Sequence, residues 1–223
     1  MIAVSDTRSR AIFGGTFDPV HIGHMRTAID ARRQLLVDTL YLMPCHIPVH
    51  RDEPGCTAEQ RRDMLELAIA GNTGLALDDR ELRRGAPSYS LDSIVEIRGE
   101  VGPDAPVFLL LGSDSFASFD QWYRWDELIE LCHLVVVERL GVPAIYSQPV
   151  RELLRSRQVD SVESMHESAG GLILSLILTP WQVSATAVRE AIDRGESTRY
   201  LLPDAVLRYI SDNQLYNYGN LPK

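Results

Sequence analysis

The sequence predicts an α/β protein in which a doubly wound parallel sheet carries helices on both faces and a small helical extension follows it. Short apolar runs recur along the chain with little alternation of polar residues, which is typical of strands buried on both faces. Longer amphipathic segments separate these runs, and this alternation favours parallel strands joined by right-handed crossovers. No strand-like run follows residue 178, so the last segments are expected to be helical.

Six runs are predicted to be strands, and a turn signal ends the first two. The run 11–15 ends in a glycine pair, and the run 39–44 ends at Pro44. The predicted strands are residues 11–15, 39–44, 74–79, 107–114, 133–139 and 171–178.

Six amphipathic segments are predicted to be helices, at residues 25–36, 57–70, 90–100, 120–132, 185–195 and 204–216. Gly195 is expected to cap the fifth at its C-terminal end, and Pro203 precedes the sixth. We expect a single domain over residues 1–223, with an α/β core at about 10–180, a helical part at 181–215 and a loose tail at 216–223.

The charge and composition exclude several classes of protein. The 223 residues carry a formal net charge of -9, which argues against binding to nucleic acid or to an anionic membrane surface. Lys223 is the only lysine, so an anion inside the fold has to be held by arginine, histidine, backbone N–H groups or a metal ion. Three cysteines make no disulfide framework, and the chain shows neither a secretory leader nor an apolar run long enough for a membrane helix. We therefore expect a cytoplasmic protein.

The stretch GGTFDPVHIGH, residues 14–24, follows the first predicted strand and carries the strongest chemical signal. Its glycine pair has no side chains, so a phosphate can approach the backbone there. Asp18 is a good N-cap and Pro19 suits a first helical position, which predicts a helix that begins at once. His21 and His24 then lie one turn apart on the same helix face. Backbone N–H groups, the helix dipole and two imidazoles would converge there, so we predict a phosphate site.

Position for position, this stretch resembles the (G/T)xFDPxHxGH signature of the nucleotidyltransferase superfamily, which includes pyridine-nucleotide and phosphopantetheine adenylyltransferases. Over about residues 10–215 the chain more narrowly resembles the bacterial nicotinate-nucleotide adenylyltransferases. The segments that carry this resemblance are LDDRELRRGAPSYSLDSI, LLLGSDSFASFDQWYRWDEL, VVVER and VSATAVREAI, at residues 77–94, 109–128, 135–139 and 183–192. The resemblance implies a Rossmann-like fold and transfer of AMP from ATP to the 5′-phosphate of nicotinate mononucleotide, giving deamido-NAD and pyrophosphate.

In that reaction a phosphate oxygen is already an adequate nucleophile, so no activated serine or cysteine is needed. The protein has to bring two anions together in line and to stabilise the charge that moves onto pyrophosphate. The resemblance places His21 and His24 at the ATP phosphates as catalytic residues, where the phosphates favour the charged imidazoles. It implies Mg²⁺ held mainly by ATP phosphates and water, with no all-protein metal site. Further ATP contacts are expected from Gly14, Gly15, Thr16, Phe17, Gly112, Asp114 and Arg139.

Two of these ATP contacts have ordinary structural alternatives. Asp114 can accept from the ribose hydroxyls or cap the turn that follows it. Arg139 ends a predicted strand and can reach the nucleotide or remain a surface residue.

The segment VSATAVREAI predicts a second anion site at a helix N-terminus. Ser184 is a plausible N-cap, and Thr186 and Arg189 lie three residues apart on one face of the helix. The resemblance makes all three residues ATP contacts at the β- and γ-phosphates. The alternative is an ordinary capped surface helix, and Ala185 stands where many relatives have serine.

The acceptor side of the predicted site is carried by three segments. By resemblance, Trp122 stacks on the pyridine ring and Tyr123 lies beside it. Trp122 and Trp125 are also spaced like a buried helical stripe, so core packing is the alternative for Trp122 and the expectation for Trp125. Donors from the loop that ends at Ser90, together with Cys45, His46, His50 and Arg51, are the other expected substrate contacts.

The segment MPCHIPVHRD, residues 43–52, departs from the pattern P-N-x-P-P-H-(R/K) of many relatives. Cys45 and His46 replace the asparagine-containing part, whereas His50 and Arg51 keep the pattern. A zinc site from Cys45, His46, His50 and Cys56 is an alternative, although the spacing matches no common zinc pattern.

Other functions share parts of these motifs. Residues 21–24 spell HIGH, the signature of class I aminoacyl-tRNA synthetases, but those enzymes need a lysine-bearing second loop and an RNA-binding surface. Phosphopantetheine adenylyltransferases are usually shorter and lack the SFDQWYRWDE segment, and a nucleotide sensor without catalysis would not need both histidines and both phosphate motifs. We expect small-molecule substrates with no nucleic acid or membrane partner, and the oligomeric state is left open, a homo-oligomer included.

Overall fold

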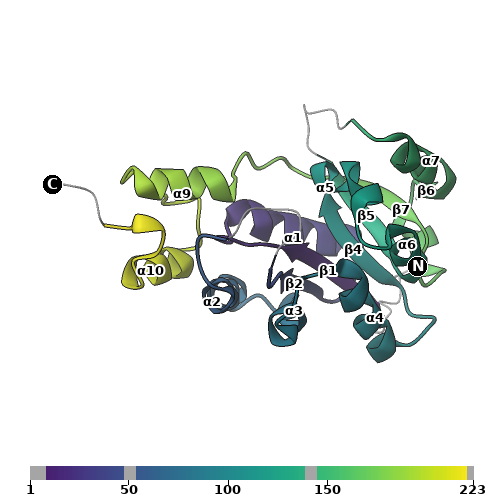
Figure 1. The fold of residues 1–223 in the computed structure, drawn as a ribbon, viewed down its shortest axis with the longest axis horizontal. Coiled ribbons are helices and arrows are strands. Elements are labelled where there is room, and N and C mark those ends of the chain that lie inside the picture. The colour runs from purple at the N-terminus through teal and green to yellow at the C-terminus, as the bar shows by residue number, and fades with distance from the viewer. Residues whose placement is uncertain (1–8, 48–53, 139–144, 220–223) are drawn as a thin grey trace.

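The computed structural model describes residues 9–47, 54–138 and 145–219, and their strands form one parallel sheet at the centre of the protein (Figure 1). The order of its seven strands is β3-β2-β1-β4-β5-β7-β6, and every neighbouring pair is parallel. The strands are β1 (Arg10–Gly15), β2 (Leu40–Pro44), β3 (Leu75–Leu77), β4 (Val107–Gly112), β5 (His133–Glu138), β6 (Gln158–Val159) and β7 (Ile173–Ile177). Each of the six predicted runs overlaps one of these strands, and β1 begins one residue before its run. The two-residue β6 was missed because it is too short to form a run.

Helices connect the strands and extend the chain beyond the sheet. They are α1 (Ile22–Gln34), α2 (Ala58–Ile69), α3 (Arg80–Arg84), α4 (Ser90–Val101), α5 (Ser113–Ala117), α6 (Trp125–Leu131), α7 (Gln148–Arg157), α8 (Val162–His166), α9 (Ala185–Asp193) and α10 (Asp204–Asp212). Gly195 has a φ of 68° and donates its N–H to Ile192 O, so the predicted glycine end of α9 is confirmed. The helix predicted over 120–132 is wrong in its first part, because Arg124 has a φ of 50° and α6 begins only after it.

Two apolar layers, one on each face of the sheet, form the core. Alternate strand residues enter opposite layers, as Ala11 and Ile12 do in β1. One layer packs against α1, α2, α8, α9 and α10, and the other against α4, α5, α6 and α7. The predicted doubly wound α/β fold with a C-terminal helical part is thereby confirmed, and α9 and α10 share their core with the sheet (Figure 1).

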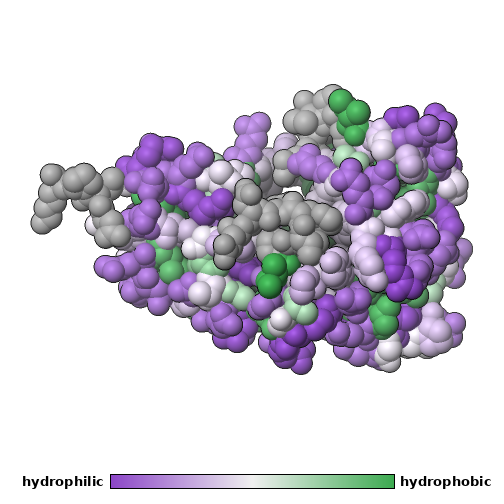
Figure 2. Space-filling view, in the orientation of Figure 1, coloured by the Kyte–Doolittle hydropathy of each residue, from purple (hydrophilic) through white to green (hydrophobic). Residues whose placement is uncertain are grey.

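The surface in Figure 2 is mostly hydrophilic, and its hydrophobic residues are scattered over this face rather than gathered in one patch. Within the described ranges, no helix is long and apolar enough to cross a membrane.

Candidate active site

The carboxyl ends of β1 and β4 lie side by side at the centre of the sheet, and the chain leaves them in opposite directions. From β1 it passes to β2 on one side, and from β4 to β5 on the other. Ligands of open α/β sheets bind at such a switch point. Open space is present there, because a Cβ added at Gly14 or at Gly112 would meet no atom within 4 Å.

The loop after β1 differs from its prediction. The helix predicted to begin directly after Asp18 begins at Ile22, and the N-cap is His21. The Asp18–Pro19 peptide bond is cis, and Asp18 turns its carboxylate to partners from later in the chain. Asp18 is therefore not the N-cap of α1, because other donors already occupy its carboxylate.

The buried ring of Phe17 packs against the backbone of this loop at Gly15. Its φ is 51° and its side chain is buried, with the ring within 3.0 Å of a Cβ built at Gly15. The absence of a side chain at Gly15 makes room for this ring, whereas the open space that a phosphate needs lies at Gly14. Any ATP contact of Phe17 has to come from its backbone.

The two predicted catalytic histidines lie together and cap α1 reciprocally. Their rings stack with centroids 3.7 Å apart. His24 N donates to Nδ1 of His21 and His21 N donates to Nδ1 of His24, each over 3.3 Å. A ring nitrogen that accepts carries no hydrogen, so Nε2 of each neutral ring bears the proton and remains as a donor.

His21 is also enclosed by its neighbours. Its residue is 5% exposed, and burial lowers the pKa of His21 to about 4. A Cβ at Gly23 would lie 3.1 Å from the His21 ring, so Gly23 makes room for this imidazole rather than for a ligand. His21 is neutral near pH 7, and the charged form predicted in contact with phosphates stays a prediction for the ATP complex.

The predicted second anion site meets the loop after β1, as a shared triphosphate site requires. Arg189 Nη1 donates to Asp18 O over 2.6 Å and lies 3.6 Å from Asp18 Oδ2. Arg189 Nη2 donates to Thr186 Oγ1 over 3.4 Å, and the Ser184 hydroxyl accepts from Ala187 N. Ser184 is therefore the N-cap of α9 as predicted, and the helix tip adjoins the histidine loop.

The end of the chain also reaches this loop. Tyr216 donates its hydroxyl hydrogen to Asp18 Oδ1 over 2.7 Å, and its oxygen lies 2.7 Å from Sγ of Cys56. Cys56 Sγ and Gly55 N donate to the same carboxylate over 3.0 and 2.8 Å. Burial, then the hydrogen bond to Asp18, raises the pKa of Cys56 to about 12. The loose tail predicted from residue 216 is wrong for Tyr216, because a sequence pattern does not show a contact this distant.

Replacing Tyr216 with phenylalanine is expected to destabilise the fold by about 1–2 kcal/mol, because the Asp18 carboxylate loses a buried donor. Urea unfolding followed by circular dichroism measures the effect. Tyr200→Phe is the matched control, because Tyr200 is 80% exposed. Equal stability of Tyr216→Phe and the unmodified protein would show that the hydroxyl does not hold Asp18.

The predicted acceptor loop after β2 is held by residues that the sequence analysis missed. His46 N donates to Ser88 Oγ over 2.9 Å, and Ile47 pairs with Pro87 in a short bridge. Arg61, in α2, is 1% exposed and donates to backbone oxygens of the loops after β1 and β2. A signal was available for Arg61, because Arg61, Met64, Leu65 and Ala68 follow a buried helical stripe.

The other predicted acceptor residues gather at the start of α4. Ser90 is the first residue of α4, and no side chain caps this helix at Tyr89. The rings of Tyr89 and Tyr123 lie 4.9 Å apart. Trp122 is half-buried and packs against Phe119, so its contact with the core is real. The structure thus brings the segment of Tyr89 and Ser90 together with the segment of Trp122 and Tyr123.

Of the remaining predicted residues, Gly112 and Asp114 belong to the described part of the chain. Gly112 ends β4 and precedes α5, and Asp114 is exposed in the first turn of that helix. Asp114 is therefore close to the switch point and also near the positive end of α5. The predictions for His50, Arg51 and Arg139 lie outside the described residues.

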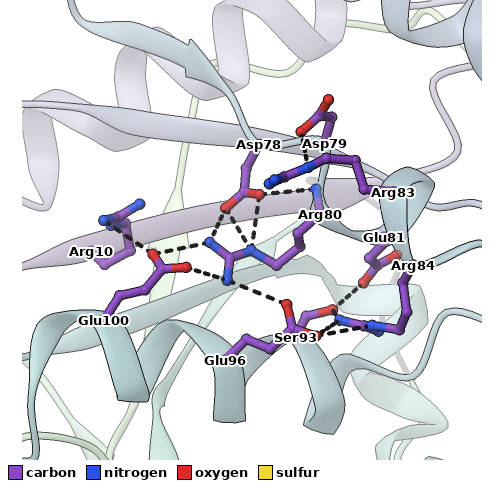
Figure 3. Close-up of polar contacts among 10 residues, drawn as sticks. All are labelled: Arg10, Asp78, Asp79, Arg80, Glu81, Arg83, Arg84, Ser93, Glu96 and Glu100. Atoms are coloured by element: carbon purple, nitrogen blue, oxygen red, sulfur yellow. Dashed lines mark hydrogen bonds and ion pairs between the residues drawn. The ribbon is translucent and has the colours of Figure 1, made fainter.

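A partly buried ionic cluster joins α3 and the residues just before it to α4, as Figure 3 shows. Arg80 donates to both oxygens of Asp78 over 2.9 Å and to Glu100 over 3.0 and 3.2 Å. Burial acts to lower the pKa of Arg80, but these hydrogen bonds outweigh it and raise the pKa. Glu81 accepts from Ser93 Oγ over 2.7 Å, and burial raises the pKa of this carboxyl.

The described side chains offer no ready-made metal centre, because no group of three or more His, Cys, Asp or Glu residues among them is arranged to hold a metal ion. The zinc alternative includes His50, which is not among these side chains. Cys45 contacts Thr16 and Arg61, and burial raises the pKa of the Cys45 thiol.

The sequence of the chain matches a family model and many named relatives. A family model described as cytidylyltransferase-like matches residues 12–191. A protein of Cellvibrio japonicus named "Probable nicotinate-nucleotide adenylyltransferase" is 45% identical over 205 residues, which cover 92% of this chain and 97% of that protein. A Pseudomonas syringae protein of the same name is 44% identical and covers 96% of both chains.

A likeness to a solved structure supports the fold. The structure of Plasmodium falciparum nicotinic acid mononucleotide adenylyltransferase complexed with NaAD matches with a TM-score of 0.71 and 13% identity, over 96% of this chain and 99% of that one.

Proposed function

Since the chain belongs to the family of nicotinate-nucleotide adenylyltransferases, we propose that it transfers the adenylyl group of ATP to the 5′-phosphate of nicotinate mononucleotide and releases pyrophosphate. The observation that carries this proposal is the meeting of two anion-binding elements: the histidine loop after β1 and the tip of α9, joined by Arg189 and Asp18. ATP and the mononucleotide are the two small-molecule substrates.

The chemistry asked of the protein is positioning and charge stabilisation. The attacking group is a phosphate oxygen, so no side chain has to be deprotonated to make a nucleophile. The open space beside Gly14 and Gly112 accommodates nucleotide against the backbone of β1 and β4. Arg189 and Thr186 supply donors toward the β- and γ-phosphates from the N-terminal turns of α9.

The histidine pair supplies the donors nearest to the transferred group in this proposal. The reciprocal capping bonds fix both Nδ1 atoms, so each neutral ring can donate only through Nε2. A donor held in this way costs no reorganisation when negative charge develops on the leaving oxygen.

The donor set fits a magnesium ion that arrives with the nucleotide. Residues of the histidine loop and of α9 supply nitrogen and hydroxyl donors suited to phosphate, so phosphate oxygens and water would be the ligands of the ion. Magnesium, when bound, neutralises phosphate charge. Arg189, His21 and His24 bind and orient the phosphates.

On the acceptor side, the proposal uses the cluster of Trp122, Tyr123 and the start of α4. Trp122 offers a half-buried aromatic face for the pyridine ring. The uncapped first turn at Ser90 offers backbone N–H groups to the nicotinate carboxylate, which the helix dipole also favours. Cys45 and His46 border this cluster through Ser88.

Pyrophosphate release from ATP, measured with a panel of acceptors, tests the proposed function. Nicotinate mononucleotide is expected to be used with a kcat/KM about tenfold or more above that of nicotinamide mononucleotide, because a carboxylate gains charge-assisted hydrogen bonds at α4. Phosphopantetheine is expected to give no release. The proposal would be contradicted if phosphopantetheine were the only acceptor that gave pyrophosphate release, or if none of the acceptors gave any.

A further inference from the structure

Arg61 bridges two loops that leave neighbouring strands. Its Nη1 donates to Thr16 O over 2.8 Å and to Cys45 O over 2.7 Å, and its Nη2 donates to His46 O over 3.0 Å. Thr16 follows β1 and belongs to the proposed ATP loop, whereas Cys45 and His46 follow β2 in the proposed acceptor loop. One guanidinium therefore holds both substrate loops.

The hydrogen bonds of Arg61 lie just beyond the point where the backbone hydrogen bonds between β1 and β2 end. The last backbone bond between the two segments runs from Cys45 N to Gly15 O over 3.0 Å. Beyond this bond the backbones part, and the Arg61 guanidinium accounts for three further hydrogen bonds with their carbonyl oxygens. The planar fork of an arginine can serve several acceptors in fixed directions, which a lysine ammonium cannot reproduce.

The surroundings of Arg61 are unusual for a buried cation. The residue is 1% exposed, and within the described ranges no carboxylate forms an ion pair with it. A buried charge is costly unless hydrogen bonds compensate it. Here three backbone carbonyl groups accept from the two Nη atoms, whereas Nε is buried and has no hydrogen-bond partner among the described residues. Its neighbour Arg62 forms a partly exposed pair with Asp63 instead.

Ser88 holds the acceptor loop from the opposite side. Its Oγ accepts from His46 N over 2.9 Å, while His46 O accepts from Arg61. Ser88 also lies beside the buried carboxylate of Glu81 and acts to lower the pKa of that group, which burial raises. Both polar groups of the His46 backbone are thereby fixed, one by α2 and one by the segment before α4.

We infer that Arg61, together with Ser88, is a positioning residue that sets the distance between the loop binding ATP and the loop binding the acceptor phosphate. This role rests on the proposed function. In-line transfer requires the two phosphates to meet in one geometry, and a displacement of about 1 Å can lower the rate about a hundredfold. Substrate binding to each loop alone depends less on the distance between the loops.

The variant Arg61→Lys tests this inference, with Arg62→Lys as the matched control on the same helix. The kcat of Arg61→Lys is expected to fall about a hundredfold, while the Kd of ATP and of nicotinate mononucleotide, each measured alone by calorimetry, changes less than about threefold. Arg62→Lys is expected to keep its kcat. A folded Arg61→Lys protein with an unchanged kcat would overturn the inference.

Hydrogen exchange of the backbone gives a readout that does not depend on turnover. Arg61→Lys is expected to speed exchange in peptides covering residues 15–18 and 45–47, and Arg62→Lys in neither. Failure of the proposed function would appear as absent turnover in the unmodified protein, whereas failure of the inference would appear as unchanged exchange.

Ser88→Ala keeps the test decisive if Arg61→Lys does not fold. This variant removes one acceptor from a partly exposed side chain, and it is expected to lower kcat about tenfold and to speed exchange at residues 45–47 alone. Unchanged kcat and exchange in Ser88→Ala would refute the shared positioning role.

Discussion

Replacing His24 with alanine is expected to lower kcat between about a hundredfold and a thousandfold, because the proposed site loses a fixed donor to the phosphates. The imidazole also accepts a hydrogen bond from His21 N at the start of α1, so the alanine variant loses a capping contact as well. Steady-state pyrophosphate release measures kcat, and circular dichroism with urea unfolding measures the fold.

His24→Gln separates the two roles of this side chain. A glutamine three residues after an N-cap can accept from the N-cap N–H, so this variant is expected to recover the stability lost in His24→Ala. Its kcat is expected to stay low, because the glutamine side chain places no N–H group at the position that Nε2 of the imidazole occupies. Near-normal turnover in either variant would show that His24 has no catalytic role.

The second large effect is expected at Arg80, where replacement by methionine should lower the free energy of unfolding by about 3–5 kcal/mol. Asp78 and Arg80 are both buried, with side chains 5% and 6% exposed and charged groups 2.8 Å apart. Removal of the guanidinium leaves the Asp78 carboxylate buried without its main donor. Urea unfolding at neutral pH measures the loss.

Arg83→Met is the matched control, because Arg83 forms a similar pair with Asp79 but its side chain is 71% exposed. It is expected to change stability by less than about 1 kcal/mol. The double variant Asp78→Leu with Arg80→Met should be more stable than Arg80→Met, since the buried Asp78 carboxylate is then no longer left without its partner. Equal losses at Arg80 and Arg83 would contradict the role of burial.

The sheet was predictable because its strands are nearly continuous apolar runs, such as Val107–Gly112 in β4. The place of the site beyond the carboxyl ends of the strands follows from a general rule once parallel strands are recognised. The strand order does not, because doubly wound sheets occur in more than one order. The contact of α9 with the first loop was predictable only through the resemblance, since a capped helix with an arginine has many ordinary uses.

Local patterns failed where distant contacts decide the conformation. Asp18 and Pro19 have the residue types of a helix start, but the carboxylate of Asp18 accepts hydrogen bonds from Gly55, Cys56 and Tyr216, so the helix begins later, at a histidine N-cap. Trp122 and Trp125 have helical spacing, yet the left-handed backbone of Arg124 separates them.

Arg61 illustrates a different difficulty. Its place on the buried stripe of α2 signals burial, but no sequence pattern indicates which acceptors it meets. Those acceptors are carbonyl oxygens, which every residue carries, so the identity of Thr16, Cys45 and His46 gives no hint of the contact.

The hydrogen bond from Tyr216 to Asp18 joins residues separated by 198 positions. Contacts of such long range impose a high entropy cost during folding, so they form after the local and intermediate ones. A growing polypeptide can therefore pair its central strands before the loop after β1 gains this contact, because the Asp18 carboxylate receives its donor from Tyr216 only once nearly the whole chain has been synthesised.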